Sequence, residues 1–429
     1  MSPITNKPVH HVADDLLPNG FKKERTRVLT GNDLKIESDE RKSVFYWMQR
    51  DVRTVDNWAL ALASYLASSR GQTLRVIYAL PPPPMKKEEI PALVNLPVNA
   101  RHADFLMGGV ELVYKELKDL NIPLHLIQAK SHDKIGETVC KEVLENDVSV
   151  LVSDFSPIRE YRQWMEIQAL PLLEEKQVPF YQVDTHNVVP VWAASDKREY
   201  AARTIRPKIH KVMDDYLQDF PAISANKNSV KLPSFTREEY ENHMNINNSV
   251  KPVDWAKPGT DAAMKQFEGF CRNKLDDFGD LRNDPNAEAC SNLSPWINHG
   301  HISAQRLTMK IDELGKDSEG CETYVEESVI RRELADNFVY YTLDKYDSLE
   351  AAYDWAKDTL DDHKTDDREY IYSLEELENG KTHEDVWNAA QLQLVQEGHM
   401  HGFMRMYWSK KVSCRLWFWE VTVIDSLHN

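Results

Sequence analysis

Oxidisable and cationic side chains gather near the C-terminal end of the chain, in the stretch WNAAQLQLVQEGHMHGFMRMYWSKK (387–411). It contains Trp387, Arg405, Met406, Tyr407 and Trp408, within about six turns if the whole stretch is one helix. Tryptophan and tyrosine are the side chains through which single electrons can travel to a buried cofactor. A tryptophan stripe on a helix is, however, more often ordinary core packing. These residues therefore indicate one-electron chemistry and leave a structural role open.

Small and hydroxylated residues form a second candidate site, in NDPNAEACSNLSPWINHGHISAQ (283–305). A helix is expected to begin near Pro295, directly after Ser291, Asn292 and Ser294. Hydroxyl and free backbone N–H groups at a helix start suit a phosphate or pyrophosphate. Serine and asparagine before a proline are also ordinary helix caps. The residues alone do not decide between these two roles.

A carboxylate supplies the third candidate, on the amphipathic stretch ETYVEESVIRRELADNF (322–338). Glu327 and Arg331 are four residues apart, so a simple helix salt pair is one interpretation. If burial raised its pKa, the Glu327 carboxyl would be able to donate a hydrogen bond and stabilise a radical anion.

Metal chemistry is not predicted. Two H-x-H pairs, His299/His301 and His399/His401, have neither a CxxC companion nor a nearby carboxylate framework. The cysteines at 140, 271, 290, 321 and 414 also show no CxxC spacing, which favours a reducing intracellular compartment.

The composition is that of a globular protein with two or three domains, because the 429 residues are 41% hydrophobic and 28% charged. No apolar run has the length of a membrane span, and the N-terminus has no signal-peptide core. The net charge of −17 argues against diffuse nucleic-acid binding. Two basic runs, 203–211 and 405–415, nevertheless provide a local footprint that is compatible with DNA.

Strand patterns alternate with helical periodicity between residues 44 and 185, which predicts a doubly wound parallel sheet. The strand candidates are VFYW (44–47), LRVIYAL (74–80), PLHLIQ (123–128), VSVLVSDF (148–155) and PFYQVD (179–184). GxGxxG and GxxxxGK[ST] motifs are absent, so ordinary dinucleotide or P-loop binding is not expected. Helical periodicity then runs through 261–278, 299–315, 322–343, 348–361, 373–379 and 384–411.

These patterns divide the chain into a mobile N-terminal tail, an α/β domain, an interdomain linker, an all-α domain and a divergent tail. The expected bounds are 1–40, 41–190, 191–260, 261–411 and 412–429. The KKER cluster within the first tail is taken as a solvated charge run or, less favoured, a weak nuclear address.

The segments DFGDLRNDP, CSNLSPWINHGHISAQ and 387–411 closely resemble the flavin domain of class II cyclobutane-pyrimidine-dimer photolyases, which are light-driven DNA-repair enzymes. The resemblance covers roughly residues 40–411. It implies an α/β antenna-type domain and a helical FAD-binding domain, the latter incomplete. It also implies reduced FAD, an optional antenna pigment such as a deazaflavin, and UV-damaged DNA containing cyclobutane pyrimidine dimers. The expected protein is a monomer, not bound to membranes, and intracellular with the nucleus favoured.

Residue roles follow from the same resemblance. It implies flavin contacts for Phe278, Cys290, Ser291, Asn292, Leu293, Ser294 and Arg405. It implies DNA contacts for Arg282 and Met406, and a hydrogen bond from Glu327 to the pyrimidine carbonyl. Trp387 and Trp408 match electron-relay positions, and Tyr372 matches a tyrosine beside that route.

The chain departs from the family from Val412 onward, where VSCRLWFWEVTVIDSLHN replaces the last helices of the flavin pocket. Translated intron sequence and true divergence both explain this tail. The family's next relay tryptophan is Arg415 here, and a tyrosine that usually faces the flavin is Phe278. The alternatives to repair are therefore a truncated, inactive protein that binds damaged DNA or a protein partner, and a cryptochrome-like light-signalling protein.

Overall fold

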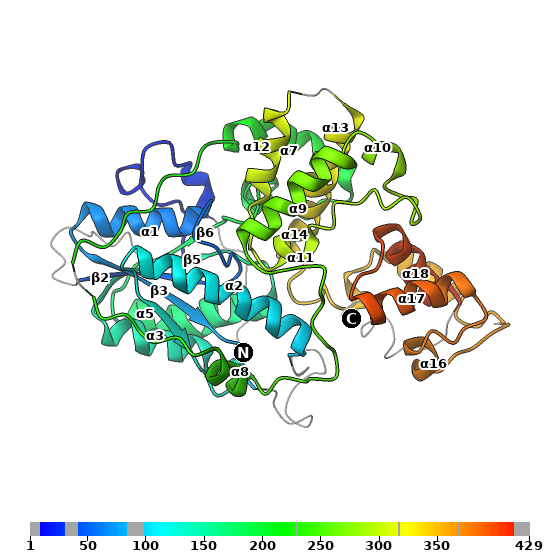
Figure 1. Cartoon of the computed structure of the whole chain (residues 1–429), viewed down its shortest axis with the longest axis horizontal. Coiled ribbons are helices and arrows are strands. Elements are labelled where there is room, and N and C mark those ends of the chain that lie inside the picture. The colour runs from blue at the N-terminus through cyan, green and yellow to red at the C-terminus, as the bar shows by residue number, and fades with distance from the viewer. Residues whose placement is uncertain are drawn as a thin grey trace.

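A six-stranded sheet organises the first half of the chain (Figure 1). The computed structural model describes residues 9–30, 42–83, 98–228, 230–315, 318–367 and 369–415. The strand order is β1-β6-β5-β2-β3-β4, and only β1 runs antiparallel to its neighbour. The strands are β1 (Thr26–Val28), β2 (Ser43–Met48), β3 (Thr73–Ala79), β4 (Leu124–Ile127), β5 (Val148–Asp154) and β6 (Phe180–Val183). The predicted α/β class is therefore confirmed.

Helices cover both faces of this sheet, as Figure 1 shows. The helices α1 (Trp58–Ser69) and α2 (Ala100–Asp119) pack on one face, in the same hydrophobic cluster as Tyr46. The helix α3 (Ile135–Glu145) packs on the other face, with Trp47. Successive residues of β2 thus point into different cores, and all six are buried. Burial on both faces explains the nearly continuous apolar runs of the central strands.

The N-terminal segment is part of the fold, so the prediction of a mobile tail was wrong for residues 9–30. This segment forms two short 3-10 helices, η1 (Asp14–Leu16) and η2 (Lys23–Arg25), and then strand β1. Phe21 packs edge-on against Trp58, with 5.2 Å between the ring centres. Arg25, the last residue of KKER, is only 1% exposed and does not belong to a solvated charge run. Residues 1–8 and 31–40 of the expected tail lie outside the described ranges.

The stretch expected to be a linker contains α6 (Val191–Ala194), α7 (Ala202–Tyr216) and α8 (Arg237–Met244). The helix α7 buries Ile205 and Ile209 in one cluster with Val329 and Ile330 of the helical half. Further along, the Asn226 side chain bonds to the backbone of Leu74 at the sheet. This stretch is therefore packed against both halves of the molecule.

The second half is mainly helical, as predicted. Its α-helices are α9 (Thr260–Asn273), α10 (Phe278–Leu281), α11 (Ser294–Asn298), α12 (Ala304–Glu313), α13 (Glu319–Val325), α14 (Arg332–Tyr341), α15 (Asp354–Asp362), α16 (Leu374–Glu378), α17 (Asp385–Glu397) and α18 (Gly402–Arg415). A π-helical turn, η5 (Glu326–Arg331), joins α13 to α14. Within the described ranges, no helix has the length and apolar character needed to cross a membrane.

The expected single helix over 384–411 is two helices, which corrects the sequence analysis. The helix α17 ends at Gly398, whose left-handed backbone (φ 67°) caps it, and α18 begins at Gly402. Glycine adopts this conformation without steric cost, which is why it commonly ends helices. The two helices then pack against each other.

Candidate active site

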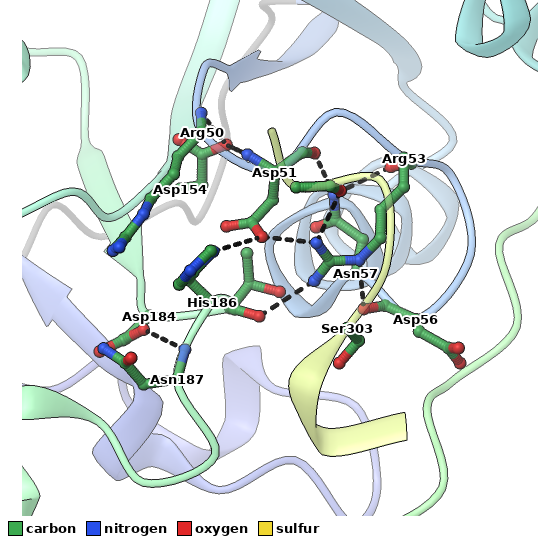
Figure 2. Close-up of polar contacts among 12 residues, drawn as sticks. Arg50, Asp51, Arg53, Asp56, Asn57, Asp154, Asp184, His186, Asn187 and Ser303 are labelled. Atoms are coloured by element: carbon green, nitrogen blue, oxygen red, sulfur yellow. Dashed lines mark hydrogen bonds and ion pairs between the residues drawn. The ribbon is translucent and has the colours of Figure 1, made fainter. Parts of the chain in front are cut away.

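A buried polar network occupies the carboxyl ends of β2, β5 and β6 (Figure 2). The Oδ2 atom of Asp154 accepts the backbone N–H groups of Gln49, Arg50 and Asp51 at 2.9, 3.0 and 3.1 Å. Burial raises the pKa of Asp154 to about 6. The strand order reverses between β2 and β5, because β3 and β4 follow on one side of β2 and β5 and β6 on the other. Open α/β sheets usually bind their ligands at such a point. In this protein the network fills that crevice.

The same network joins the two halves of the molecule. Asp51 accepts hydrogen bonds from Arg53 at 2.5 Å and from the Nδ1 atom of His186 at 3.1 Å. Arg53 also donates to the carbonyl oxygens of Thr185 and of Gly300, which belongs to the helical half. Gly300 lies so close that a Cβ atom there would be 2.2 Å from the Arg50 carbonyl oxygen. The crevice thus serves as an interdomain joint.

A cavity of about 790 Å³ lies between this joint and the helical half. Every residue that the resemblance assigned to flavin or lesion contact lines it. These are Phe278, Arg282, Cys290, Ser291, Asn292, Leu293, Ser294, Glu327, Arg405 and Met406. The volume is in the range of small-molecule and cofactor sites, about 300–1,000 Å³. Residues far apart in the sequence therefore form one site of the right size for a nucleotide cofactor.

The cavity carries an excess of positive charge, in contrast to the net charge of −17 for the whole chain. Its arginines are Arg50, Arg282, Arg331, Arg332 and Arg405, and its carboxylates are Glu327 and Asp336. Arg50 binds Asp336 through two hydrogen bonds, at 2.7 and 2.9 Å. Arg405 is exposed, lines the cavity and makes no ion pair with any described residue. An unpaired arginine in a positive cavity favours an anionic group such as a pyrophosphate.

The loop expected to hold the cofactor is fixed at several points. Asn292 has a left-handed backbone (φ 56°), which asparagine tolerates better than most residues. The Cys290 sulfur lies 3.3 Å from the Nε2 atom of His401, in the corner between α17 and α18. Burial raises the pKa of the Cys290 thiol, so this group is neutral. The Cys290–His401 contact therefore ties the loop to the opposite wall of the cavity.

Glu327 lies at the open side of the cavity and differs from the expectation in two ways. Its side chain is 44% exposed, so the burial on which its hydrogen-bond-donor role depends is not present. It pairs with Arg282 at 3.5 Å, whereas Arg331 binds Glu326 at 2.8 Å. The alternative interpretation, a simple helix salt pair between Glu327 and Arg331, is therefore wrong.

The expected relay residues lie outside the cavity lining. The rings of Trp387 and Trp408 stack with their centres 5.3 Å apart and their planes at 14°. They meet because α17 and α18 fold back on each other, and not because they share a helix face. Tyr372 packs against the same cluster, and its hydroxyl bonds to His383. The side chain of Arg415 lies outside the described part of the structure.

The α/β half contributes a wall that was not predicted from the sequence, with Arg50 and His186, and Arg50 is paired with Asp336 on α14. Arg50 belongs to QRDVR directly after β2, and His186 to DTHN directly after β6. Polar residues that follow neighbouring parallel strands meet at one edge of the sheet. This rule identifies both segments from the strand predictions alone.

Buried histidines are expected to make the stability depend on pH. Burial lowers the pKa of His186 and His299 to about 4 and that of His301 to about 3. The unfolded chain binds a proton at each of these residues below about pH 6.5. Because the unfolded state then holds more protons, each histidine contributes stability that is lost as the pH falls from about 6.5 to 4. Asp154 and Glu333 act in the opposite direction, since burial raises their pKa values to about 6 and 8.

His299→Gln isolates one histidine from these opposing groups. The quantity to follow is the free energy of unfolding of the variant minus that of the unchanged chain. As the pH is lowered from about 6 to 4.5, this difference should increase by about 1.4 kcal/mol per pH unit. Denaturant titrations at several pH values measure this difference. A difference that does not change with pH would show that His299 is not held neutral.

Comparisons with known proteins agree with this architecture. A family model described as DNA photolyase matches residues 44–225. The deoxyribodipyrimidine photo-lyase of Potorous tridactylus is 41% identical over 405 residues, which cover 93% of this chain and 72% of that protein. The enzyme of the same name from Oryza sativa subsp. japonica is 40% identical over 385 residues, covering 86% and 72%.

Solved structures share the fold at much lower identity. A cryptochrome of Synechocystis sp. PCC6803 aligns with a TM-score of 0.64 at 13% identity, covering 86% of this chain and 74% of that one. A class III photolyase of Agrobacterium tumefaciens aligns with a TM-score of 0.60 at 17% identity, covering 88% and 73%. The sequence relatives go further than the fold, because their identity extends through both the sheet and the cavity: the chain belongs to the DNA photolyase family.

Proposed function

We propose that this chain repairs cyclobutane pyrimidine dimers in UV-damaged DNA with the energy of light, using FAD bound in the cavity. The observation that carries the proposal is the convergence of separate segments, 278–294, 327 and 405–406, on one positively charged cavity. The relatives with 40–41% identity bear the name deoxyribodipyrimidine photo-lyase, which agrees with it.

The residues of the cavity divide by position into two groups. Ser291, Asn292 and Ser294, with the unpaired Arg405, would hold the pyrophosphate and the neighbouring hydroxylated chain of FAD. Bound FAD, when excited in its reduced state, supplies the electron that opens the dimer. At the mouth, Met406 is 63% exposed and Glu327 is 44% exposed, as suits groups that meet DNA. Arg282, paired with Glu327, would contact the damaged strand.

Finer features belong to the same proposal. The reduced state of FAD follows from the electron-donating role, and the stacked Trp387 and Trp408 with Tyr372 would restore it by passing electrons inward. A monomer is part of the proposal, because the residues assigned to flavin and lesion contact all come from one chain. The α/β half would hold any antenna pigment, such as a deazaflavin. The nuclear location is proposed from the DNA substrate alone, because Arg25 is buried and KKER therefore does not serve as a nuclear address.

An absorption spectrum of the purified chain, followed by blue-light treatment of an oligonucleotide with one thymine dimer, tests the proposal. Bound FAD and dimer loss only in the light are expected, with undamaged DNA and dark incubation as controls. Damage-selective binding without light-dependent repair would instead favour the non-catalytic alternative. A chain that takes up no FAD would overturn the proposal.

Glu327→Ala should reduce the repair rate strongly and change stability little. The Arg282–Glu327 pair is largely exposed, and such pairs contribute about 0–1 kcal/mol. A dimer bound at the mouth would cover Glu327 and supply the burial that its hydrogen-bond-donor role requires. Loss of one group that stabilises developing charge typically costs about 10²–10³ in rate. Single-turnover repair with chemically reduced protein measures the effect.

The neighbouring Glu326→Ala is the matched control for this variant. Glu326 binds Arg206 and Arg331 and does not line the cavity. It should therefore lose some stability and retain repair. Equal repair by the two variants would contradict the role given to Glu327.

A further inference from the structure

His186 is a polar group of the cavity that the functions described above do not use. It follows β6 on the α/β side, is 6% exposed, and lines the cavity beside Arg50. Its Nδ1 atom lies 3.1 Å from the Oδ1 atom of Asp51, as Figure 2 shows. Its Nε2 atom makes no hydrogen bond with a described residue. It is also not one of the fully buried side-chain atoms that lack a hydrogen-bond partner in the described ranges, so it must be accessible. The free ring nitrogen therefore opens into the cavity.

Asp51 fixes which ring nitrogen carries the proton. It is completely buried, and Arg53 holds it at 2.5 Å, with the Asp51 pKa held well below its usual range by Arg53 and His186 despite burial. A permanent carboxylate requires an N–H at the Nδ1 position of His186. The Nε2 atom then carries a lone pair and acts as a hydrogen-bond acceptor.

The charged groups around His186 keep the imidazole neutral. Burial lowers the pKa of His186 to about 4, and Arg50 and Arg332 act in the same direction because they oppose a further positive charge. Asp51 opposes this shift, and Asp336 on α14 of the helical half is already bound to Arg50 through two hydrogen bonds. A neutral acceptor selects an N–H donor and offers nothing to a phosphate. His186 thus differs from the arginines that surround it.

We propose that the Asp51–His186 pair is a positioning device for the bound flavin nucleotide, in which the Nε2 atom of His186 accepts a hydrogen bond from an N–H edge of one of its rings. The inference rests on the proposed function, because it takes FAD to be the ligand of the cavity. FAD presents two such edges, the imide N–H of the flavin ring and the amino group of adenine. The bound nucleotide would in this way make a hydrogen bond to the α/β half as well as its contacts to the helical half.

FAD affinity of the full chain, measured by equilibrium titration of the flavin-free protein, tests the proposal. His186→Ala should weaken FAD binding by about tenfold, the effect of one lost hydrogen bond of about 1.4 kcal/mol. His186→Gln, which retains a side-chain acceptor, should recover part of that loss. His299→Gln is the matched control, because His299 is also a buried neutral histidine but does not line the cavity.

Ligand analogues identify the edge and exclude a merely structural effect. FAD methylated at the imide nitrogen should bind the unchanged chain more weakly than FAD, and the difference should disappear in His186→Ala. If the adenine amino group is the donor instead, FAD with that group removed should show the same pattern. Equal penalties for both analogues in the unchanged and the variant chain would overturn the proposal.

Nitrogen NMR of the flavin-free protein provides an independent readout. The Nδ1 atom of His186 should carry the proton at neutral pH, and the Nε2 signal should shift when FAD is added. A proton on Nε2 would overturn the inference while leaving the proposed function intact. Failure of the unchanged chain to bind FAD would overturn the proposed function, and with it the assignment of FAD to His186.

Discussion

Arg25→Met should lower the free energy of unfolding by about 3–5 kcal/mol, although the change lies near the N-terminus. The guanidinium is completely buried, and burial lowers its pKa to about 10, so it remains charged at neutral pH. It donates to Asp184 O, Asn187 O, Val188 O, Tyr216 O and Gln305 Oε1 at 2.8–3.4 Å. It also lies 4.9 Å from the ring centre of Trp58. Methionine fills part of the volume and removes the Arg25 donor from all these oxygens; Gln305 Oε1 and Tyr216 O keep other donors, the indole N–H of Trp58 and the backbone N–H of Gln218.

Lys23→Ala is the control for Arg25→Met, two residues earlier in the same 3-10 helix. The Lys23 side chain is 42% exposed and, among the described residues, pairs with exposed Asp14, so its loss should change stability by no more than about 0.5 kcal/mol. Chemical denaturation followed by circular dichroism measures both variants. Similar small effects for the two variants would mean that the N-terminal segment does not hold these three elements together: helix α7, helix α12 and the loop that follows β6.

The sequence predicts the central sheet well and its edge poorly, for a physical reason. Strands β2 and β5 are buried on both faces and contain the uninterrupted apolar segments VFYWM and VLV, which are typical of buried parallel strands. Strand β1 has only three residues, TRV, and two of its side chains are polar. It is stable because Arg25 and Phe21 reach partners that lie far away in the sequence. Local patterns cannot contain such contacts.

The site shows the same division between local and long-range information. The loop 290–294 and the residues 405–406 were found because their motifs resemble a family, and the cavity unites them. Helical periodicity over 384–411 predicts one helix for the tryptophan pair, and an isolated glycine such as Gly398 does not interrupt that pattern. Its left-handed backbone instead produces the turn that stacks Trp387 on Trp408.

The α/β wall of the cavity was missed although its segments follow predicted strands. Arg50 and His186 have no motif of their own, and their importance depends on a helical half that packs against the sheet edge. That packing in turn depends on one residue without a side chain, Gly300, at a close approach of backbone to backbone in the interdomain joint.

Gly300→Ala should therefore separate the two halves and remove the cofactor site. The new Cβ atom would lie 2.2 Å from Arg50 O, 2.4 Å from Asp51 Cα and 2.8 Å from Val52 N, all of them backbone atoms that cannot rotate away. The left-handed backbone (φ 67°) adds strain of about 1–2 kcal/mol for alanine, and overpacking adds about 1–3 kcal/mol. If the helical half moved away to relieve these clashes, the loop 290–294 would move away from Arg50 and His186 on the opposite wall of the cavity.

Gly71→Ala separates these two costs, because Gly71 has almost the same backbone (φ 65°) and no described atom within 4 Å of the added Cβ. It should lose only the strain of about 1–2 kcal/mol and retain FAD. Gly300→Ala should lose more stability and, even where it remains folded at low temperature, bind FAD at least about tenfold more weakly, since more than one wall contact is lost. Denaturation and FAD titration of both variants decide the matter. If Gly300→Ala kept the FAD affinity of Gly71→Ala, the cavity would not depend on close approach of the two halves, and the joint at Asp51 would have a purely structural role.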